Sequence, residues 1–233
     1  MRSAIISDVH SNLEALSTAL EAIEKEEIDE ILFLGDVVGY GANPNECVAL
    51  VRERCSVVLL GNHDLAAVDL SVAEEFNNHA RVAAHWTSKK LSAENREYLK
   101  SLPYTATVRE ALLVHASPFE PEEWHYIISE SDARRMFPHF KETICFVGHS
   151  HVPGVFAESA IEQDVRRGER FIVNVGSIGQ PRDGDPDLSF GIFDSERWEY
   201  RNIRLVYDVE RAARKIRDAG LPPVLADRLF RGV

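Results

Sequence analysis

The sequence predicts a layered α/β protein, and two observations lead to this fold class. Short apolar runs alternate with helical patterns through the first sixty residues. The second half instead carries strand-like runs, many of them separated by Gly or Pro. The order strand, helix, strand, helix, strand implies a parallel sheet with helices packed on its faces. We therefore expect such a sheet, with further strands supplied by the second half.

Three buried strands and two helices are expected first. The strands are Ser3–Ser7, Ile31–Leu34 and Val57–Leu60, and the helices between them are Leu13–Glu27 and Pro44–Arg54. The first helix repeats apolar residues at helical spacing. The second begins with Asn43 and Pro44, which are typical of an N-cap and a first helical position.

A polar helical stretch, Val72–Lys100, and a strand-rich half follow. The later strands are expected at Leu112–Val114, Thr143–Val147, Val155–Ala157, Phe171–Val175, Phe190–Phe193 and Trp198–Leu205, before a helix at Asp208–Ala219. Since there is no repeat or linker-like stretch, we expect a single domain over residues 1–233. A helical insert near residues 64–103 and a possible cap near residues 118–138 would build the substrate pocket. Trp124, His125 and Tyr126 are expected in a helix, either packed in the core or lining the cap.

Composition and charge exclude several classes of protein. Hydrophobic residues make up 45% and charged residues 27%, which is ordinary for a globular protein and excludes disorder. The 26 basic and 38 acidic residues give a net charge of −12, which argues against non-specific nucleic-acid binding. No apolar stretch is long enough to predict a membrane span. Three widely spaced cysteines predict neither a disulfide framework nor a cysteine-rich zinc site, so we expect a cytoplasmic location.

Metal-binding side chains follow five of the expected strands. In chain order they are Asp8 and His10, Asp36, the run Gly61-Asn62-His63-Asp64, His115, and the pair His149 and His151. Ligand sites in open α/β sheets form at the carboxyl ends of strands, so we expect these side chains to converge in one cleft.

These residue types suit divalent metal ions and phosphate chemistry. Asp and His together bind ions such as Mn, Fe, Zn or Ni. Two such ions, about 3.5–4 Å apart, can bind a phosphoryl oxygen and activate a water molecule. A nearby His that is not a ligand can then protonate the leaving oxygen. Each motif alone has a simpler explanation, a structural histidine or a glycine turn, but their joint placement favours a metal site.

Together the motifs resemble those of the calcineurin-like metallophosphoesterases. The resemblance rests on Asp8-x-His10, Gly35-Asp36, Gly61-Asn62-His63-Asp64, His115 and Gly148-His149-Ser150-His151, and extends to Asn174-Val-Gly-Ser177 and Gly179-Gln-Pro-Arg-Asp183. The chain is most similar to small bacterial phosphodiesterases and diadenosine-tetraphosphatase-like members. The resemblance implies an α/β fold that is a four-layer α-β-β-α sandwich of two mixed β-sheets flanked by helices.

The resemblance also implies a role for each site residue. Asp8, His10, Asp36 and His151 would hold one metal ion, and Asp36, Asn62, His115 and His149 the other, with Asp36 bridging. His63 would be the general acid that also contacts the phosphate, while a hydroxide between the ions attacks phosphorus in line with the leaving group. Asn62 would also contact the substrate. The cofactors would be two divalent transition-metal ions, with Mn favoured over Fe, Zn or Ni.

The second motif departs from the protein-phosphatase branch of this family. There it reads Gly-Asp-x-x-Asp-Arg-Gly, whereas here Gly39 and Tyr40 replace the Asp that orients the catalytic His and the Arg that binds phosphate. This argues against phosphoprotein hydrolysis in that style and leaves open what orients His63. Asp64 is adjacent, but neighbouring side chains often diverge. Arg182 is the candidate replacement for the phosphate-binding Arg.

Three functions remain open at this point. The first is hydrolysis of a phosphodiester, and the second is hydrolysis of a nucleoside polyphosphate or a phosphomonoester by the same chemistry. The third is a non-catalytic scaffold that binds partner proteins, which the complete ligand set and His63 disfavour. The expected partner is therefore a small phosphate-ester substrate, with no membrane and no nucleic acid, and the oligomeric state is not readable from the sequence.

Overall fold

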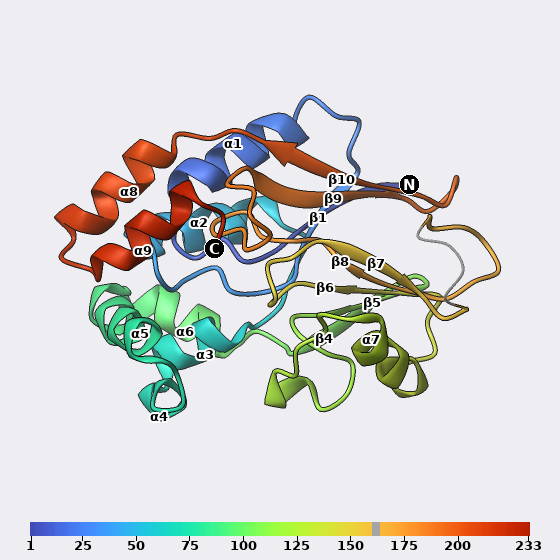
Figure 1. Cartoon of the computed structure of the whole chain (residues 1–233), viewed down its shortest axis with the longest axis horizontal. Helices are drawn as coiled ribbons and strands as arrows, with labels where there is room; N and C mark the ends of the chain where they lie inside the picture. Colours follow the sequence, from blue (N-terminus) through green and yellow to red (C-terminus); the bar gives the residue numbers. More distant parts are fainter. Residues whose placement is uncertain (160–163) are drawn as a thin grey trace.

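Two five-stranded mixed sheets stack face to face in the computed structural model, which describes residues 1–159 and 164–233 (Figure 1). Helices cover the outer face of each sheet. The prediction of an α/β sandwich of two mixed sheets flanked by helices is confirmed.

The first sheet contains the three strands that precede Asp8, Asp36 and Asn62. Its order is β10-β9-β1-β2-β3, with bounds β1 (Arg2–Ile6), β2 (Glu30–Phe33), β3 (Val57–Val58), β9 (Leu188–Asp194) and β10 (Glu199–Leu205). Strands β1, β2 and β3 are parallel to one another, whereas β9 pairs antiparallel with β1. Strand β1 is thus hydrogen-bonded to a strand that lies much later in the sequence.

The second sheet has the order β4-β5-β6-β8-β7. Its strands are β4 (Thr105–Val108), β5 (Ala111–Val114), β6 (Ile144–Val147), β7 (Gly154–Ala157) and β8 (Phe171–Asn174). Strands β5, β6 and β8 are parallel, and β4 and β7 are antiparallel at the two edges. The carboxyl ends of β5 and β6 therefore lie at one edge of this sheet.

Helices form the two outer layers. They are α1 (Leu13–Ile23), α2 (Pro44–Arg54), α3 (Asn62–Val68), α4 (Leu70–Ala73), α5 (Asn78–Lys90), α6 (Ala93–Lys100), α7 (Glu130–Met136), α8 (Val209–Asp218) and α9 (Pro223–Asp227), with 3₁₀ turns η1 (Pro121–Glu123), η2 (Phe137–His139) and η3 (Arg228–Phe230). Buried residues of α1, α2, α5 and α8 pack with the outer face of the first sheet. Helix α7 packs on the outer face of the second sheet.

Alternation along the strands explains the layering. On β1, Ala4 and Ile6 pack against the helices, whereas Ile5 packs in the core between the sheets. On β6, Ile144 and Phe146 face the same central core. Successive strand side chains point to opposite faces, so a strand that is apolar on both faces must be covered on both sides.

Local structure differs from the sequence-based expectation at three places. Val72–Lys100 is not one helix, because the side chains of Asn77 and Ser92 accept backbone N–H bonds that start new helices at α5 and α6. Strand β4 was not expected, and its side chains alternate between exposed and half-buried, as on an edge strand. Residues 124–126 are not helical, and Trp124 has a left-handed φ of 56° that ends turn η1.

Candidate metal centre and active site

Carboxyl ends of strands from both sheets meet at one place, and the expected site residues gather there. Asp8 and His10 follow β1, Asp36 follows β2, and Asn62 and His63 begin α3 after β3; His115 follows β5, and His149 and His151 follow β6. All eight are buried. Arg182, in the loop before β9, is half-buried. The structure thus brings together side chains from five strand ends that are up to 143 positions apart (8 to 151).

Five of these residues have a left-handed backbone. Asp8, His10, Asp36, His149 and His151 have φ values between 48° and 63°. For residues other than Gly this conformation costs about 1–3 kcal/mol each, and it persists where the surrounding structure imposes it, most often at functional sites. The sharp turns it produces direct each side chain back over the strand ends.

The first group of metal-binding atoms contains Asp8, His10 and His151. Asp8 Oδ1 lies 3.2 Å from His151 Nε2 and 3.7 Å from His10 Nε2. The two histidine Nε2 atoms are 3.1 Å apart. Three ligand atoms within reach of one another define a position for one cation.

The second group contains Asp36, His115 and His149, with Asn62 beside it. Asp36 Oδ2 lies 3.4 Å from His115 Nε2, and Asn62 Oδ1 lies 3.3 Å from the same nitrogen. Asp36 Oδ2 is also 3.6 Å from His10 Nε2 of the first group. Asp36 therefore lies between the two groups, where one carboxylate can contact two ions.

Main-chain carbonyls set the orientation of three histidines. Nδ1 of His10 lies 3.1 Å from the Val38 oxygen, and Nδ1 of His115 lies 3.2 Å from the Leu34 oxygen. Nδ1 of His151 lies 2.5 Å from the Gln180 oxygen. A carbonyl accepts the Nδ1 proton, so each ring in its neutral form presents Nε2 as a lone pair to the cluster, the arrangement typical of histidine metal ligands.

A backbone N–H group orients each of the two carboxylates, Asp8 and Asp36. The His149 backbone N–H donates to Asp8 Oδ2 at 3.0 Å, and the His63 backbone N–H donates to Asp36 Oδ1 at 2.8 Å. Each carboxylate thus keeps its other oxygen for the cluster. Asp8 Oδ1 and His149 Nε2 are buried without a hydrogen-bond partner among the described residues. Buried acceptors left unsatisfied in a set of Asp, His and Asn donors fit a divalent transition-metal ion.

Electrostatics favour the protonation states that metal binding requires at Asp8, Asp36, His149 and His151, but oppose them at His115. Burial opposes ionisation of Asp8 and Asp36, but the neighbouring His151 and His115 outweigh it and hold both pKa values below 3.8. Burial, with His115 nearby, lowers the pKa of His149 to about 3. Burial and Arg182 lower that of His151 to about 4. Burial also disfavours charged His115, but Asp36 overcomes it and raises the pKa to about 9. A cation in this place would have to displace the His115 proton.

His63 is held by aromatic rings rather than by a carboxylate. Its ring lies 4.4 Å from the Tyr40 ring and 4.6 Å from the Phe76 ring, centroid to centroid. Within the described part of the chain its Nδ1 is buried and has no hydrogen-bond partner. A Cβ on Gly39 would lie 2.8 Å from that nitrogen. Gly39 therefore leaves room for the ring, and packing takes over the orienting role of the missing Asp.

Asp64 has a role that the sequence did not reveal. Its Oδ2 accepts the backbone N–H groups of Asp36 at 2.8 Å and Gly61 at 3.1 Å, and its Oδ1 accepts that of Val38 at 3.0 Å. Asp64 thus fixes the turn that carries Asp36 instead of orienting His63. Burial and the nearby Asp36 raise its pKa to about 7.

Asn174 supports the other histidine loop from β8. Its Nδ2 donates to the Gly148 oxygen at 2.7 Å and to Ser150 Oγ at 2.9 Å. Ser177 Oγ donates to the Asp8 backbone oxygen at 2.8 Å. The Asn174-to-Ser177 motif therefore holds the backbone of two ligand turns.

Aromatic rings border the second group. The Tyr126 ring lies 4.1 Å from the His149 ring, centroid to centroid, and Tyr126 is 53% exposed. The Trp124 ring lies 5.8 Å from the His115 ring. These residues were expected in a helix; instead an irregular segment places them beside the ligands, with Tyr126 open to solvent.

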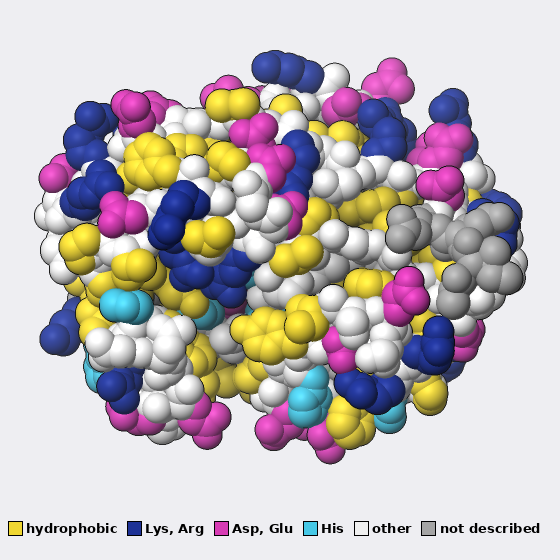
Figure 2. Space-filling model, in the orientation of Figure 1, with side chains coloured by type: hydrophobic (Ala, Val, Ile, Leu, Met, Phe, Trp, Pro, Cys, Tyr) yellow, Lys and Arg dark blue, Asp and Glu magenta, His cyan; other side chains and the backbone are white. Residues whose placement is uncertain are grey.

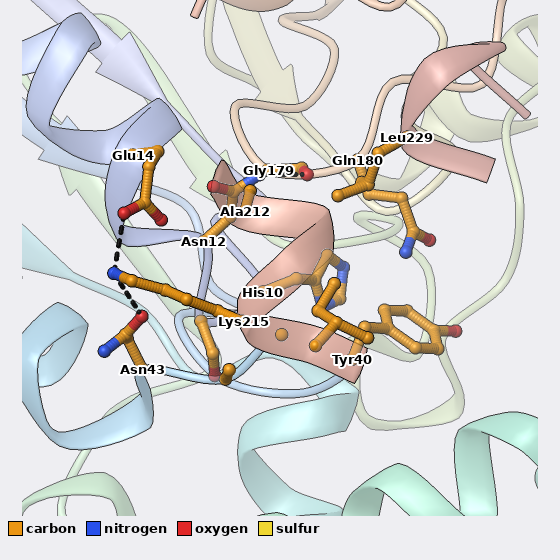
Figure 3. Close-up of a pocket in the computed structure, with 14 residues that line it drawn as sticks. His10, Asn12, Glu14, Tyr40, Asn43, Gly179, Gln180, Ala212, Lys215 and Leu229 are labelled. Atoms are coloured by element: carbon orange, nitrogen blue, oxygen red, sulfur yellow. Dashed lines mark hydrogen bonds and ion pairs between the residues drawn. The ribbon is translucent and has the colours of Figure 1, made fainter. Parts of the chain in front are cut away.

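The pocket next to His10 is small. It is lined by His10 and Tyr40, is bounded by Lys215 (Figure 3) and has a volume of about 10 Å³. That volume holds about one water molecule. This pocket is therefore too small to hold a phosphate ester.

Gly148 allows Asp8 to approach the histidine loop closely. A Cβ built on Gly148 would overlap with Ser7 Oγ and Asp8 Oδ2. We expect Gly148→Ala to displace Asp8 and to lower phosphoesterase activity about 100-fold, since a shift of about 1 Å can cost that much. Steady-state kinetics with folding checked by circular dichroism measures this. The matched control is Gly154→Ala on β7, where a Cβ would meet only Phe156 at 3.5 Å; equal losses in both variants would contradict the explanation.

A comparison with family models identifies the superfamily to which the chain belongs. The model of the calcineurin-like phosphoesterase superfamily domain matches residues 1–197. The chain therefore belongs to the calcineurin-like phosphoesterase superfamily, whose members typically bind divalent metal ions.

Individual relatives cover nearly the whole chain. Protein MJ0912 of Methanocaldococcus jannaschii is 37% identical over 98% of this chain and 97% of its own length. The crystal structure of a metallophosphoesterase from Sphaerobacter thermophilus is 41% identical, with a TM-score of 0.89 over 100% of this chain and 99% of that one. Phosphodiesterase YfcE of Escherichia coli is 25% identical over 84% of this chain and 89% of its own.

Two further expectations concern membrane and redox context. None of the helices in residues 1–159 and 164–233 has the length and apolar character needed to cross a bilayer. Cys47, Cys55 and Cys145 are free cysteines.

Proposed function

We propose that this protein is a metal-dependent phosphoesterase that hydrolyses phosphodiesters at the cluster around Asp36. The observation that carries the proposal is the pair of metal-binding groups on either side of Asp36 Oδ2, with His63 beside them. Family membership and the similarity to phosphodiesterase YfcE support it.

The first group would hold one ion with Asp8, His10, Asp36 and His151. The second would hold another with Asp36, Asn62, His115 and His149. Bound divalent ions would supply positive charge for the phosphoryl oxygens and lower the pKa of water nearby. We propose Mn as the native ion, ahead of Fe, Zn or Ni, because cellular availability rather than affinity selects among them.

His63 would protonate the leaving oxygen. Burial lowers the pKa of its ring well below 6.5, so the ring is neutral in the free site. A phosphate entering beside it would favour the protonated ring, because a neighbouring negative charge raises a histidine pKa. Asn62 and Arg182 would contact the phosphate. We also propose a cytoplasmic location, which the free cysteines support.

Removal of metal tests the proposal directly. Protein purified without chelator should contain about two ions per chain and cleave bis-p-nitrophenyl phosphate faster than p-nitrophenyl phosphate. Dialysis against a chelator should lower the rate at least about 100-fold, and Mn²⁺ should restore it.

The other outcomes would favour a different function or contradict the proposed site. Preference for the monoester would make the protein a phosphatase. Metal without turnover on either ester would favour a polyphosphate substrate or a scaffold. Protein that takes up no metal, even after reconstitution, would contradict the proposed site.

A further inference from the structure

A second arginine lies beside the proposed phosphate contact. Arg182 and Arg228 both lie near Tyr40, with guanidinium carbons 5.7 Å and 5.8 Å from its ring centroid. Arg228 begins turn η3, beyond the residues that the family model matches. Figure 2 shows Lys and Arg side chains gathered beside a hollow in this face, close to the C-terminal end marked in Figure 1.

Neither guanidinium is neutralised by a carboxylate side chain within 4 Å among the residues that the structure describes. Arg182 Nη2 donates to Gln180 Oε1 at 2.9 Å and lies 3.4 Å from the Tyr40 hydroxyl. Its Nε is buried without a partner in the described chain. Arg228 Nε donates to the main-chain oxygen of Val233, the last residue of the sequence, at 2.5 Å. Two guanidinium groups beside the same tyrosine ring, neither paired with an Asp or Glu side chain in the described chain, favour an anion beside them.

Burial and the nearby Arg182 lower the pKa of the Arg228 guanidinium. This lowered pKa indicates that the guanidinium groups of Arg228 and Arg182 repel each other and that Arg228 is partly removed from water. In a chain of net charge −12, acidic side chains are plentiful, so the lack of an Asp or Glu ion pair on either arginine in the described chain is a property of the site and not of the composition.

Arg228 is fixed in place by the C-terminal helices. On α8, Lys215 Nζ lies 2.6 Å from Glu14 Oε1 and donates to Asn43 Oδ1 at 3.0 Å (Figure 3). Leu229 is 3% exposed in the core. The Gly184 N–H donates to the Gly232 oxygen at 2.9 Å, which ties this segment to the loop that carries Arg182. The segment that carries Arg228 and the loop that carries Arg182 are therefore held together.

The Tyr40 ring neighbours both this pair and the reactive cluster. Its ring is 4.7 Å from the His10 ring and 4.4 Å from the His63 ring. An anion held by the arginines would thus be next to a phosphoryl group at the metal ligands.

We propose that Arg182 and Arg228 form a subsite for a second phosphate group of the substrate, next to the phosphoryl group that reacts. The proposal rests on the proposed phosphoesterase function and narrows its substrates to esters that carry adjacent phosphates. Guanidinium groups suit this role because one guanidinium can donate two parallel N–H hydrogen bonds to two oxygens of the same phosphate.

Binding of a matched pair of ligands tests the subsite without turnover. The probes are AMP and the non-hydrolysable α,β-methylene analogue of ADP, titrated by calorimetry into the Mn²⁺-loaded protein. We expect the wild type to bind the ADP analogue about tenfold more tightly than AMP. Arg228→Gln should remove most of this preference, and Arg228→Lys should restore part of it.

The control is Arg214→Gln, an equal charge change on an exposed position of α8, which should keep the preference. Thermal denaturation checks that each variant is folded. If Arg228→Gln does not fold, the comparison is made with Arg228→Lys instead. Equal binding of the two probes by the wild type, or an equal loss of both in Arg228→Gln, would overturn the subsite. Failure to hydrolyse bis-p-nitrophenyl phosphate, p-nitrophenyl phosphate and a dinucleoside tetraphosphate alike would instead count against the phosphoesterase function, since the binding experiment does not depend on turnover.

Discussion

Asp36→Asn should abolish phosphoester hydrolysis and reduce the metal content of the protein. Asp36 Oδ2 lies within 3.6 Å of both His10 Nε2 and His115 Nε2, so it is the only carboxylate oxygen in the described chain that borders both groups this closely. Loss of a residue that merely supports a metal ligand costs about 10–100-fold, so loss of the shared ligand should exceed about 100-fold in rate. Metal per chain, measured by mass spectrometry, should fall in parallel.

Asn has the shape of Asp and keeps an oxygen for the His63 N–H, so the fold should survive the change. Asp218→Asn, at the exposed end of α8, is the matched control and should keep both metal and rate. Full activity with normal metal content in Asp36→Asn would show that the two groups do not share this carboxylate.

His63→Asn should separate metal binding from turnover. If His63 donates a proton to the leaving oxygen, its loss should lower kcat by about 10²–10⁴-fold while the metal content stays unchanged. The deficit should be smaller for esters with a very acidic leaving group, because these need less protonation. Rates for a series of aryl phosphodiesters against leaving-group pKa measure this.

A different outcome is possible on geometric grounds, because His63 also forms a group with His10 and Asp36 whose ligand atoms lie within 4.8 Å of one another. If His63→Asn loses metal, His63 is a ligand and not the proton donor. His79→Asn, exposed at the start of α5, controls for the loss of an imidazole and should change neither quantity.

The fold could be predicted where local patterns determine it. The apolar runs that end at Ser7 and Leu34 lie within a residue or two of strands β1 and β2, because buried parallel strands need continuous apolar sequence. Edge strand β4 was missed, since its half-exposed residues lack that signal. The breaks before α5 and α6 depend on single capping side chains, Asn77 and Ser92, which a helical periodicity does not register.

The candidate site likewise has parts that the sequence predicts and parts that it does not. Convergence of Asp8 and Asp36 could be predicted, because parallel strands of one sheet bring their carboxyl ends to one edge. His115 was also expected there, but it follows a strand of the second sheet and joins them because the two sheets stack. The surroundings of His63 could not, since Phe76 reaches it from a turn that has no sequence link to the motif. Arg228 was not singled out either, because it reaches the site only through the packing of α8 and η3.

The pairing of β1 with β9 has a consequence for the order in which the chain is made. Strand β1 leaves the ribosome long before its second neighbour, residues 188–194, has been made. The N–H that orients Asp8 belongs to His149, and the oxygen that orients His151 belongs to Gln180. Contacts between such distant residues form late in folding, because a long loop must close first. A partly made chain therefore holds its acids and imidazoles apart, and catalytic competence should arise only when the last strands are in place.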